Sequence, residues 1–134
     1  MADYILVPTS PGELIDKLTI LRLKEERIND PAKFANVRIE KDALMTTASA
    51  CVPHSVALDV LWEELYQINA DLWVIEDDIR KLERARDFGD EFVRLARAVY
   101  ITNDRRADVK KQINVLLGSA LIEEKSYADH GVVP

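Results

Sequence analysis

The sequence predicts an all-α domain in which a long antiparallel helical hairpin packs with two shorter N-terminal helices. The chain has 134 residues, 48% hydrophobic, 31% charged and only four glycines, a balance typical of one ordinary helical domain. Aliphatic residues recur with a strict heptad period over residues 56–86, and a second such run follows after one short turn. Two long helices joined this tightly lie antiparallel, so we expect residues 1–134 to form a single bundle.

Residues 1–9 are expected to form a short strand or arm. The stretch DYILVP, residues 3–8, has the β-branched and aromatic content of a strand, and Pro8 ends it. A lone strand leaves its backbone hydrogen-bonding groups unpaired, so it needs a partner strand.

Residues 10–50 are expected to form two helices. In SPGE, residues 10–13, Ser10 suits the N-cap, Pro11 the first helical position, and Glu13 completes a capping box. This helix runs to about residue 28. Asp30-Pro31 repeats the same start, and the second helix covers roughly residues 31–49 before a loop that ends at a cap on Ser55. The apolar positions of the two helices are Leu14, Leu18 and Leu21, and Phe34, Val37, Leu44 and Met45.

The hairpin is expected over residues 56–118. Gly89 is predicted to take a left-handed conformation in its turn, and Asp90 to cap the second helix. Gly118 ends that helix, and residues 119–134 are expected to form a short helix, ALIEEK, and a polar tail. The seam positions are Leu58, Leu61, Leu65, Ile68, Leu72, Ile75, Ile79 and Leu82 in the first helix, and Phe92, Leu95, Val99, Thr102, Arg106, Val109, Ile113 and Leu116 in the second.

The two hairpin helices carry opposite charge. Residues 59–79 contain seven acids and no base, whereas residues 94–111 contain six bases against two acids. We expect these stretches to pair across the hairpin, each exposed pair contributing about 0.2–1 kcal/mol.

Arg106 and Thr102 occupy seam positions, where a desolvated guanidinium costs several kcal/mol unless it is paired. Antiparallel pairing about Gly89 makes Asn69, Asp71 and Glu76 the available partners, and Asn103 belongs to the same polar patch. Three interpretations stay open: a buried network that fixes helix register, a pocket in which Arg106 faces a bound anion, and a seam exposed at this point.

Trp62, Tyr66 and Trp73 recur on the flank of the seam and form an apolar area too large to leave in water. Either the N-terminal helices or a second copy of the chain covers this stripe. With the lone strand, it favours a homodimer. Such stripes are more often core than cofactor site, so no cofactor is expected.

Several functional classes find no support. The N-terminus lacks a signal peptide and no stretch reaches the ~18 apolar residues of a membrane span, so a cytoplasmic location is expected. Cys51 is the only cysteine, His54 and His130 are isolated, and no metal-binding motif is present. The net charge of -6 disfavours nucleic-acid binding.

Two helical enzyme classes have sites built from acidic and basic side chains. The ExxE and ExxD pairs of helical NTP pyrophosphatases do not occur in the acidic helix, since Glu63 and Glu64 are followed three residues later by Tyr66 and Gln67, and Glu76 and Asp77 by Ile79 and Arg80. Arg106, Asn103 and Glu76, with Arg22 or Lys17, reproduce only part of the dicarboxylate site of helical chorismate mutases.

The stretches SPGELIDKLTILRLKEERI, NVRIEKDAL, LWEELYQINADLWVIEDDIR, VYITNDRRADVKKQIN and LLGSALIEEKSY resemble a family of short bacterial proteins, a domain of unknown function. Similar sequences occur near or fused to glycosyltransferases, so the resemblance implies a glycosyltransferase partner and a link to cell-surface glycan assembly. It implies no catalytic residue. We therefore expect a homodimeric interaction or accessory module. The alternative is an anion-binding or mutase-like enzyme that uses Arg106.

Overall fold

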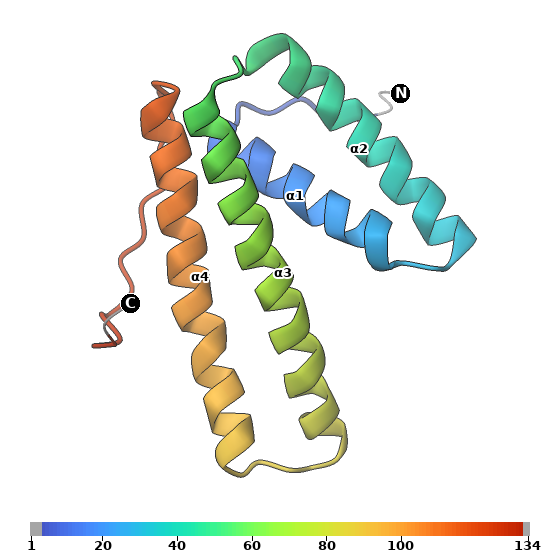
Figure 1. Ribbon diagram of the computed structural model, residues 1–134, viewed down its shortest axis with the longest axis vertical. Helices are drawn as coiled ribbons and strands as arrows, with labels where there is room; N and C mark the ends of the chain where they lie inside the picture. Colours follow the sequence, from blue (N-terminus) through green and yellow to red (C-terminus); the bar gives the residue numbers. More distant parts are fainter. Residues whose placement is uncertain (1–3, 133–134) are drawn as a thin grey trace.

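The computed structural model describes residues 4–132 and contains four helices over that range (Figure 1). They are α1 (Pro11–Arg27), α2 (Pro31–Cys51), α3 (Val56–Arg84) and α4 (Asp90–Leu116). Helices α3 and α4 run antiparallel as a long hairpin, so the predicted all-α class and the hairpin are confirmed.

Three helices begin where their capping residues predict. The side chains of Ser10, Asp30 and Ser55 accept hydrogen bonds from backbone N–H groups three residues further on. Pro11 and Pro31 follow two of these caps, because a missing N–H costs nothing in the first turn of a helix. Local chemistry within four residues therefore sets these helix starts.

Helix α1 lies across one face of the hairpin and contacts both α3 and α4, whereas α2 lies back along α1 and makes no close backbone approach to the hairpin (Figure 1). The core forms where α1 crosses the hairpin, around Ile15, Leu58, Leu65, Ile68 and Ile113, each at most 1% exposed. Two shorter helices do precede the hairpin, as predicted. Of the two, only α1 packs between other helices, with α2 on one side and the α3–α4 hairpin on the other.

Gly12 allows α1 to begin against the C-terminal part of α4. Its backbone N–H donates to Asn114 Oδ1 at 2.7 Å. A Cβ atom at this position would lie 2.5 Å from the carbonyl oxygen of Lys110, which is too close for any side chain. The contact fixes the end of α1 that positions the polar groups described below.

The predicted N-terminal strand is wrong for the residues that are described. Residues 4–10 form no strand, and the side chains of Tyr4, Ile5, Leu6 and Val7 are 70–86% exposed. Strand-like composition does not make a strand without a neighbouring strand to accept its hydrogen bonds. Residues 1–3 lie outside the described range.

The predicted short last helix is also absent, since residues 120–132 contain no helix. This segment runs beside α4 and is held by polar contacts, including one between Lys110 and Glu123. A six-residue apolar and acidic stretch is too short to be a stable helix without packing.

The turn of the hairpin differs from the prediction. Arg86, with φ 53°, takes the left-handed position, whereas Gly89 has φ -78° and is itself the N-cap of α4. Asp87 Oδ1 accepts from the Gly89 N–H at 3.2 Å, and Asp90 becomes the first residue of the helix. The turn begins earlier than expected because α3 ends at Arg84.

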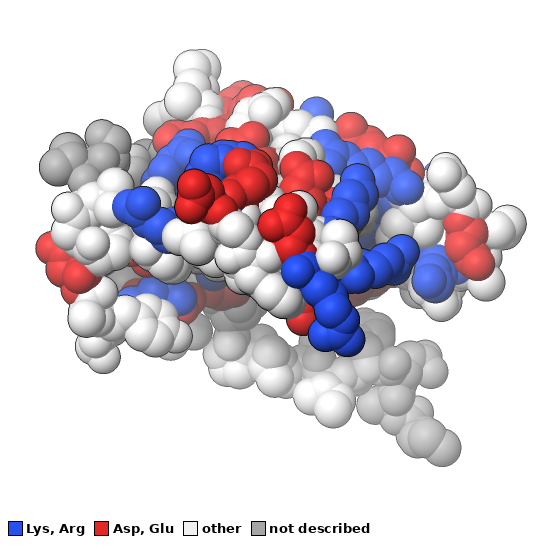
Figure 2. All heavy atoms as spheres, turned by 90° about the horizontal axis from the view of Figure 1, so that it is seen from below, with Lys and Arg blue, Asp and Glu red and all other residues white. Residues whose placement is uncertain are grey.

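The predicted charge pairing across the hairpin is not found. Within residues 4–132, no ion pair joins α3 to α4; the hairpin pairs instead with α1, as in Arg22–Glu63 at 3.1 Å and Lys110–Glu13. Seen from below, acidic and basic side chains are interspersed with uncharged ones (Figure 2).

Candidate functional site

A buried carboxylate, Asp16 of α1, lies where α1 crosses the hairpin, and it is 2% exposed. Arg106 of α4 donates from Nε to Asp16 Oδ1 at 2.9 Å and from Nη2 to Asp16 Oδ2. The two parallel hydrogen bonds give this ion pair the bidentate geometry that arginine makes best.

The other groups around Asp16 complete a polar network. Asn69 of α3 donates through Nδ2 to Asp16 Oδ1 at 2.9 Å and to Thr19 Oγ1 at 2.8 Å. The Thr19 hydroxyl in turn donates to the Asp16 carbonyl at 2.7 Å. In the described chain, no buried side-chain polar atom lacks a partner. A network satisfied in this way holds three helices in one register.

The Arg106 guanidinium stays charged. Its hydrogen bonds to Asp16 raise its pKa, although partial burial acts in the opposite direction. An arginine with a raised pKa cannot serve as a general acid or base near neutral pH. The chemistry left to Arg106 is charge pairing and hydrogen-bond donation.

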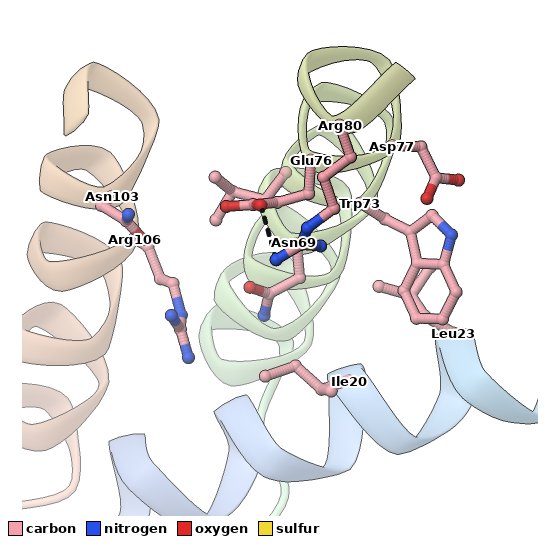
Figure 3. A pocket seen from close by; sticks show the side chains of 10 residues that line it. Ile20, Leu23, Asn69, Trp73, Glu76, Asp77, Arg80, Asn103 and Arg106 are labelled. Carbon is pink, nitrogen blue, oxygen red and sulfur yellow. Dashed lines mark ion pairs between the residues drawn. The ribbon is translucent and has the colours of Figure 1, made fainter. Parts of the chain in front are cut away.

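A pocket of about 430 Å³ opens beside this network, between α1, α3 and α4 (Figure 3). Asn103 and Arg106 project from α4, and Glu76 and Arg80, which form an ion pair at 3.2 Å, project from α3. The side-chain amide of Asn103 makes no hydrogen bond to any described residue. The lining residues are Ile20, Leu23, Asn69, Leu72, Trp73, Glu76, Asp77, Arg80, Asn103 and Arg106.

Four of the predicted polar residues, Asn69, Glu76, Asn103 and Arg106, line this one pocket. Thr102 is 6% exposed beside it, whereas Asp71 is exposed and takes no part in the network. Among the described residues, Arg106 binds Asp16 and none of the three expected partners, Asn69, Asp71 and Glu76.

Sequence reasoning missed Asp16, although a signal was present. Gly12, Asp16, Thr19 and Leu23 recur at intervals of four, three and four residues, so they share one stripe of α1. All four are buried. An acid inside a stripe of small and apolar residues indicates a buried charge that needs a cationic partner.

Helix α1 also covers the middle of the aromatic stripe. Tyr66 is 9% exposed, its hydroxyl donates to Glu26 Oε1 at 2.7 Å, and the Arg22 guanidinium lies 3.6 Å from its ring centroid. The hydrogen bond to Glu26 and burial raise the pKa of the Tyr66 phenol. Trp62 packs against the core, and Arg27 lies over Trp73 at 5.6 Å. Tyr66 is therefore a contact between helices of one chain.

The sequence pattern of a family of unknown function (DUF6165) matches residues 5–134. No curated protein and no solved structure matches the chain. Among the described residues, none of the helices is both long and apolar enough to cross a membrane, and no cluster of three or more histidine, cysteine or acidic residues is arranged to hold a metal ion.

Proposed function

The chain belongs to DUF6165, a family of unknown function, and we propose that it is a helical protein-interaction module rather than an enzyme. The observation that carries this proposal is the uncovered side of the hairpin. Helix α1 lies on only one side of the α3–α4 seam, and the backbone of α2 approaches neither hairpin helix closely, although Met45 of α2 lines a pocket with Trp62 of α3.

Apolar residues on the uncovered side support this proposal. Val60, Val74 and Leu116 are 61%, 50% and 44% exposed. A groove of about 760 Å³ lies between the first turns of α3 and the last turns of α4. It is lined by Ala57, Val60, Leu61, Asp108, Lys111, Gln112, Val115 and Leu116. Apolar residues grouped on a surface and rimmed by charged ones are typical of protein contacts.

The role of Arg106 also favours an interaction module. Its Nε and Nη2 donors are occupied by Asp16, so the positive charge that an anionic substrate would need is already neutralised inside the chain. This favours the interpretation of Arg106 as part of a buried network that fixes the register of the helices.

The pocket beside Arg106 supports a second candidate, a site for a small anion. Its volume of about 430 Å³ lies in the range of small-molecule sites. The Asn103 amide makes no hydrogen bond to any residue in the range 4–132, so it can donate to a ligand. Against this candidate, Glu76 and Asp77 line the same pocket and would repel an anion. Thermal melts with phosphate and with malonate separate the two proposals: a rise in melting temperature that Asn103→Ala abolishes would favour the site.

The wider setting rests on the family resemblance alone. We propose from it that the module acts in the cytoplasm beside glycosyltransferases that build cell-surface glycans.

Cross-linking in producing cells tests the interaction proposal. A photoreactive amino acid at position 60 lies on the uncovered hairpin side, and the same group at position 39 is the control, because Ile39 of α2 is 69% exposed but off that side. We expect adducts from position 60 and none from position 39. No adduct from position 60, or equal adducts from both, would contradict the proposal.

A further inference from the structure

We infer that the partner of the uncovered hairpin side is a second copy of this chain, so that two hairpins form a four-helix bundle about a two-fold axis parallel to their length. This inference rests on the proposed function and names its partner. Charge on that side of the hairpin is the observation that selects the partner.

The two hairpin helices present opposite charge along the uncovered side. On α3, Val60, Glu64, Asp71, Val74 and Asp78 recur at helical spacing and share one face. This face lies across the seam from Asn69 and Glu76, which face α1 and the pocket. Its charged members are all acidic.

The matching face of α4 carries two arginines and one acid, and the C-terminal segment borders it, since Ile101, Arg105 and Asp108 line a pocket with Lys125, Asp129 and His130. Arg94, Ile101, Arg105, Asp108 and Gln112 recur at helical spacing, across the seam from residues that meet α1, such as Asn103. Asp108 and Gln112 line the apolar groove with Val60, which places this face of α4 on the same side as the acidic face of α3.

Within one chain, Asp78 pairs with Lys81 and Arg94 with Glu91, each inside its own helix. In the part of the chain that the structure describes, Glu64, Asp71 and Arg105 form no ion pair, and none joins α3 to α4. An unpaired acid on α3 and an unpaired arginine on α4, lying side by side, are complementary to the same two residues of a second copy turned about a two-fold axis.

The sign of the charges also selects the orientation. With the axis parallel to the hairpins, α3 of one copy lies antiparallel to α4 of the other, as it does within the chain. Because the hairpin folds near Gly89, Asp71 and Arg105 lie at about the same level, so each Asp71 would meet the Arg105 of the second copy. An arrangement that places α3 against α3 would set acid against acid.

A second copy would stabilise most strongly the half of the hairpin that lies beyond α1, next to the turn. Beyond α1 only two helices pack together (Figure 1), and the seam residues Ile79, Leu82, Phe92 and Val99 stay partly exposed. Isolated pairs of short helical segments are marginal in water, and a bundle of four buries such a seam.

Charge reversal followed by mixing tests this inference. Asp71→Arg alone sets arginine against Arg105 of the other copy, and Arg105→Asp alone sets aspartate against Asp71. Each single variant is expected to raise the dissociation constant of the dimer about tenfold, since both contacts related by the two-fold axis become repulsive. Mixing the two variants restores both contacts in a heterodimer, so sedimentation should again give the wild-type affinity. Asp77→Arg, on the opposite side of α3, is the matched control and should leave the affinity unchanged.

Each outcome decides the matter. Single variants that dimerise like wild type, or a mixture that stays as weak as its components, would overturn the inference. If a single variant does not fold, the double variant Asp71→Arg/Arg105→Asp replaces it and should dimerise like wild type; a monomeric double variant that is folded would also overturn the inference.

The cross-link at position 60 distinguishes failure here from failure of the proposed function. An adduct of twice the chain mass of 15.2 kDa supports the second copy. An adduct with a different protein overturns the second copy while keeping an interaction module. No adduct overturns both.

Discussion

Replacing Arg106 with alanine tests whether the polar network is structural. The change leaves the Asp16 carboxylate 2% exposed without its cation, although Asn69 still donates to it. Breaking a buried ion pair from one side costs about 3–5 kcal/mol. The Arg106 side chain is 28% exposed, so water reaches this pair, and we expect the lower end, about 3 kcal/mol. For a domain of this size, that loss lowers the melting temperature by about 10 °C.

Urea unfolding followed by tryptophan fluorescence measures this loss, at one protein concentration for all variants because self-association adds to apparent stability. Arg97→Ala is the control, since Arg97 is exposed and forms no ion pair within the described residues, and it should stay within about 0.5 kcal/mol of wild type. Asp16→Asn combined with Arg106→Ala should cost less than the sum of the single changes. An Arg106→Ala variant as stable as Arg97→Ala, or strictly additive losses, would refute the structural role.

Three further predictions follow from single contacts. Gly12→Ala should destabilise the protein by about 1–3 kcal/mol in urea unfolding, because its Cβ would lie 2.5 Å from the Lys110 carbonyl; a wild-type midpoint would disprove this close packing. The pKa of the Tyr66 phenol is raised above its ordinary value of 10.0, so its contribution to stability is present below pH 10.0 and is lost as the pH rises through the folded-state pKa. The Tyr66→Phe variant should not show this loss of stability in alkaline unfolding, and a pH profile like that of the wild type would contradict the prediction. Lys110→Glu faces Glu13 and Glu123 with a like charge, so hydrogen exchange in residues 119–132 should speed up, and less so in high salt; unaltered exchange would show that these pairs do not hold the segment.

The sequence predicts those parts of the fold whose causes are local. The caps at Ser10, Asp30 and Ser55 act within three residues, and the two heptad runs with the short turn between them predict the hairpin. Antiparallel pairing about the turn sets the position of each residue along the hairpin. For this reason we expected Asn69 to lie near Asn103 and Arg106.

The parts that the sequence did not predict depend on distant partners. Asp16 and Arg106 are separated by 90 positions, and only the angle at which α1 crosses the hairpin brings them together. Tyr4–Val7 have strand-like composition, but strand formation depends on a neighbour that composition cannot supply. The acids of α3 and the bases of α4 were expected to pair with each other, yet helices in contact along an apolar seam turn their charged flanks away from it.

The mass of the protein in solution tests the central claim, that the uncovered hairpin side is an interface between two copies. Light scattering across micromolar concentrations should give twice 15.2 kDa for the wild type and for Ile39→Glu, whose exposed α2 position lies off the interface. Val60→Glu should shift the mass toward 15.2 kDa while helix content is kept, because it places a charge in the apolar groove. A wild-type mass of 15.2 kDa at every concentration, or a Val60→Glu variant that dimerises like Ile39→Glu, would contradict it.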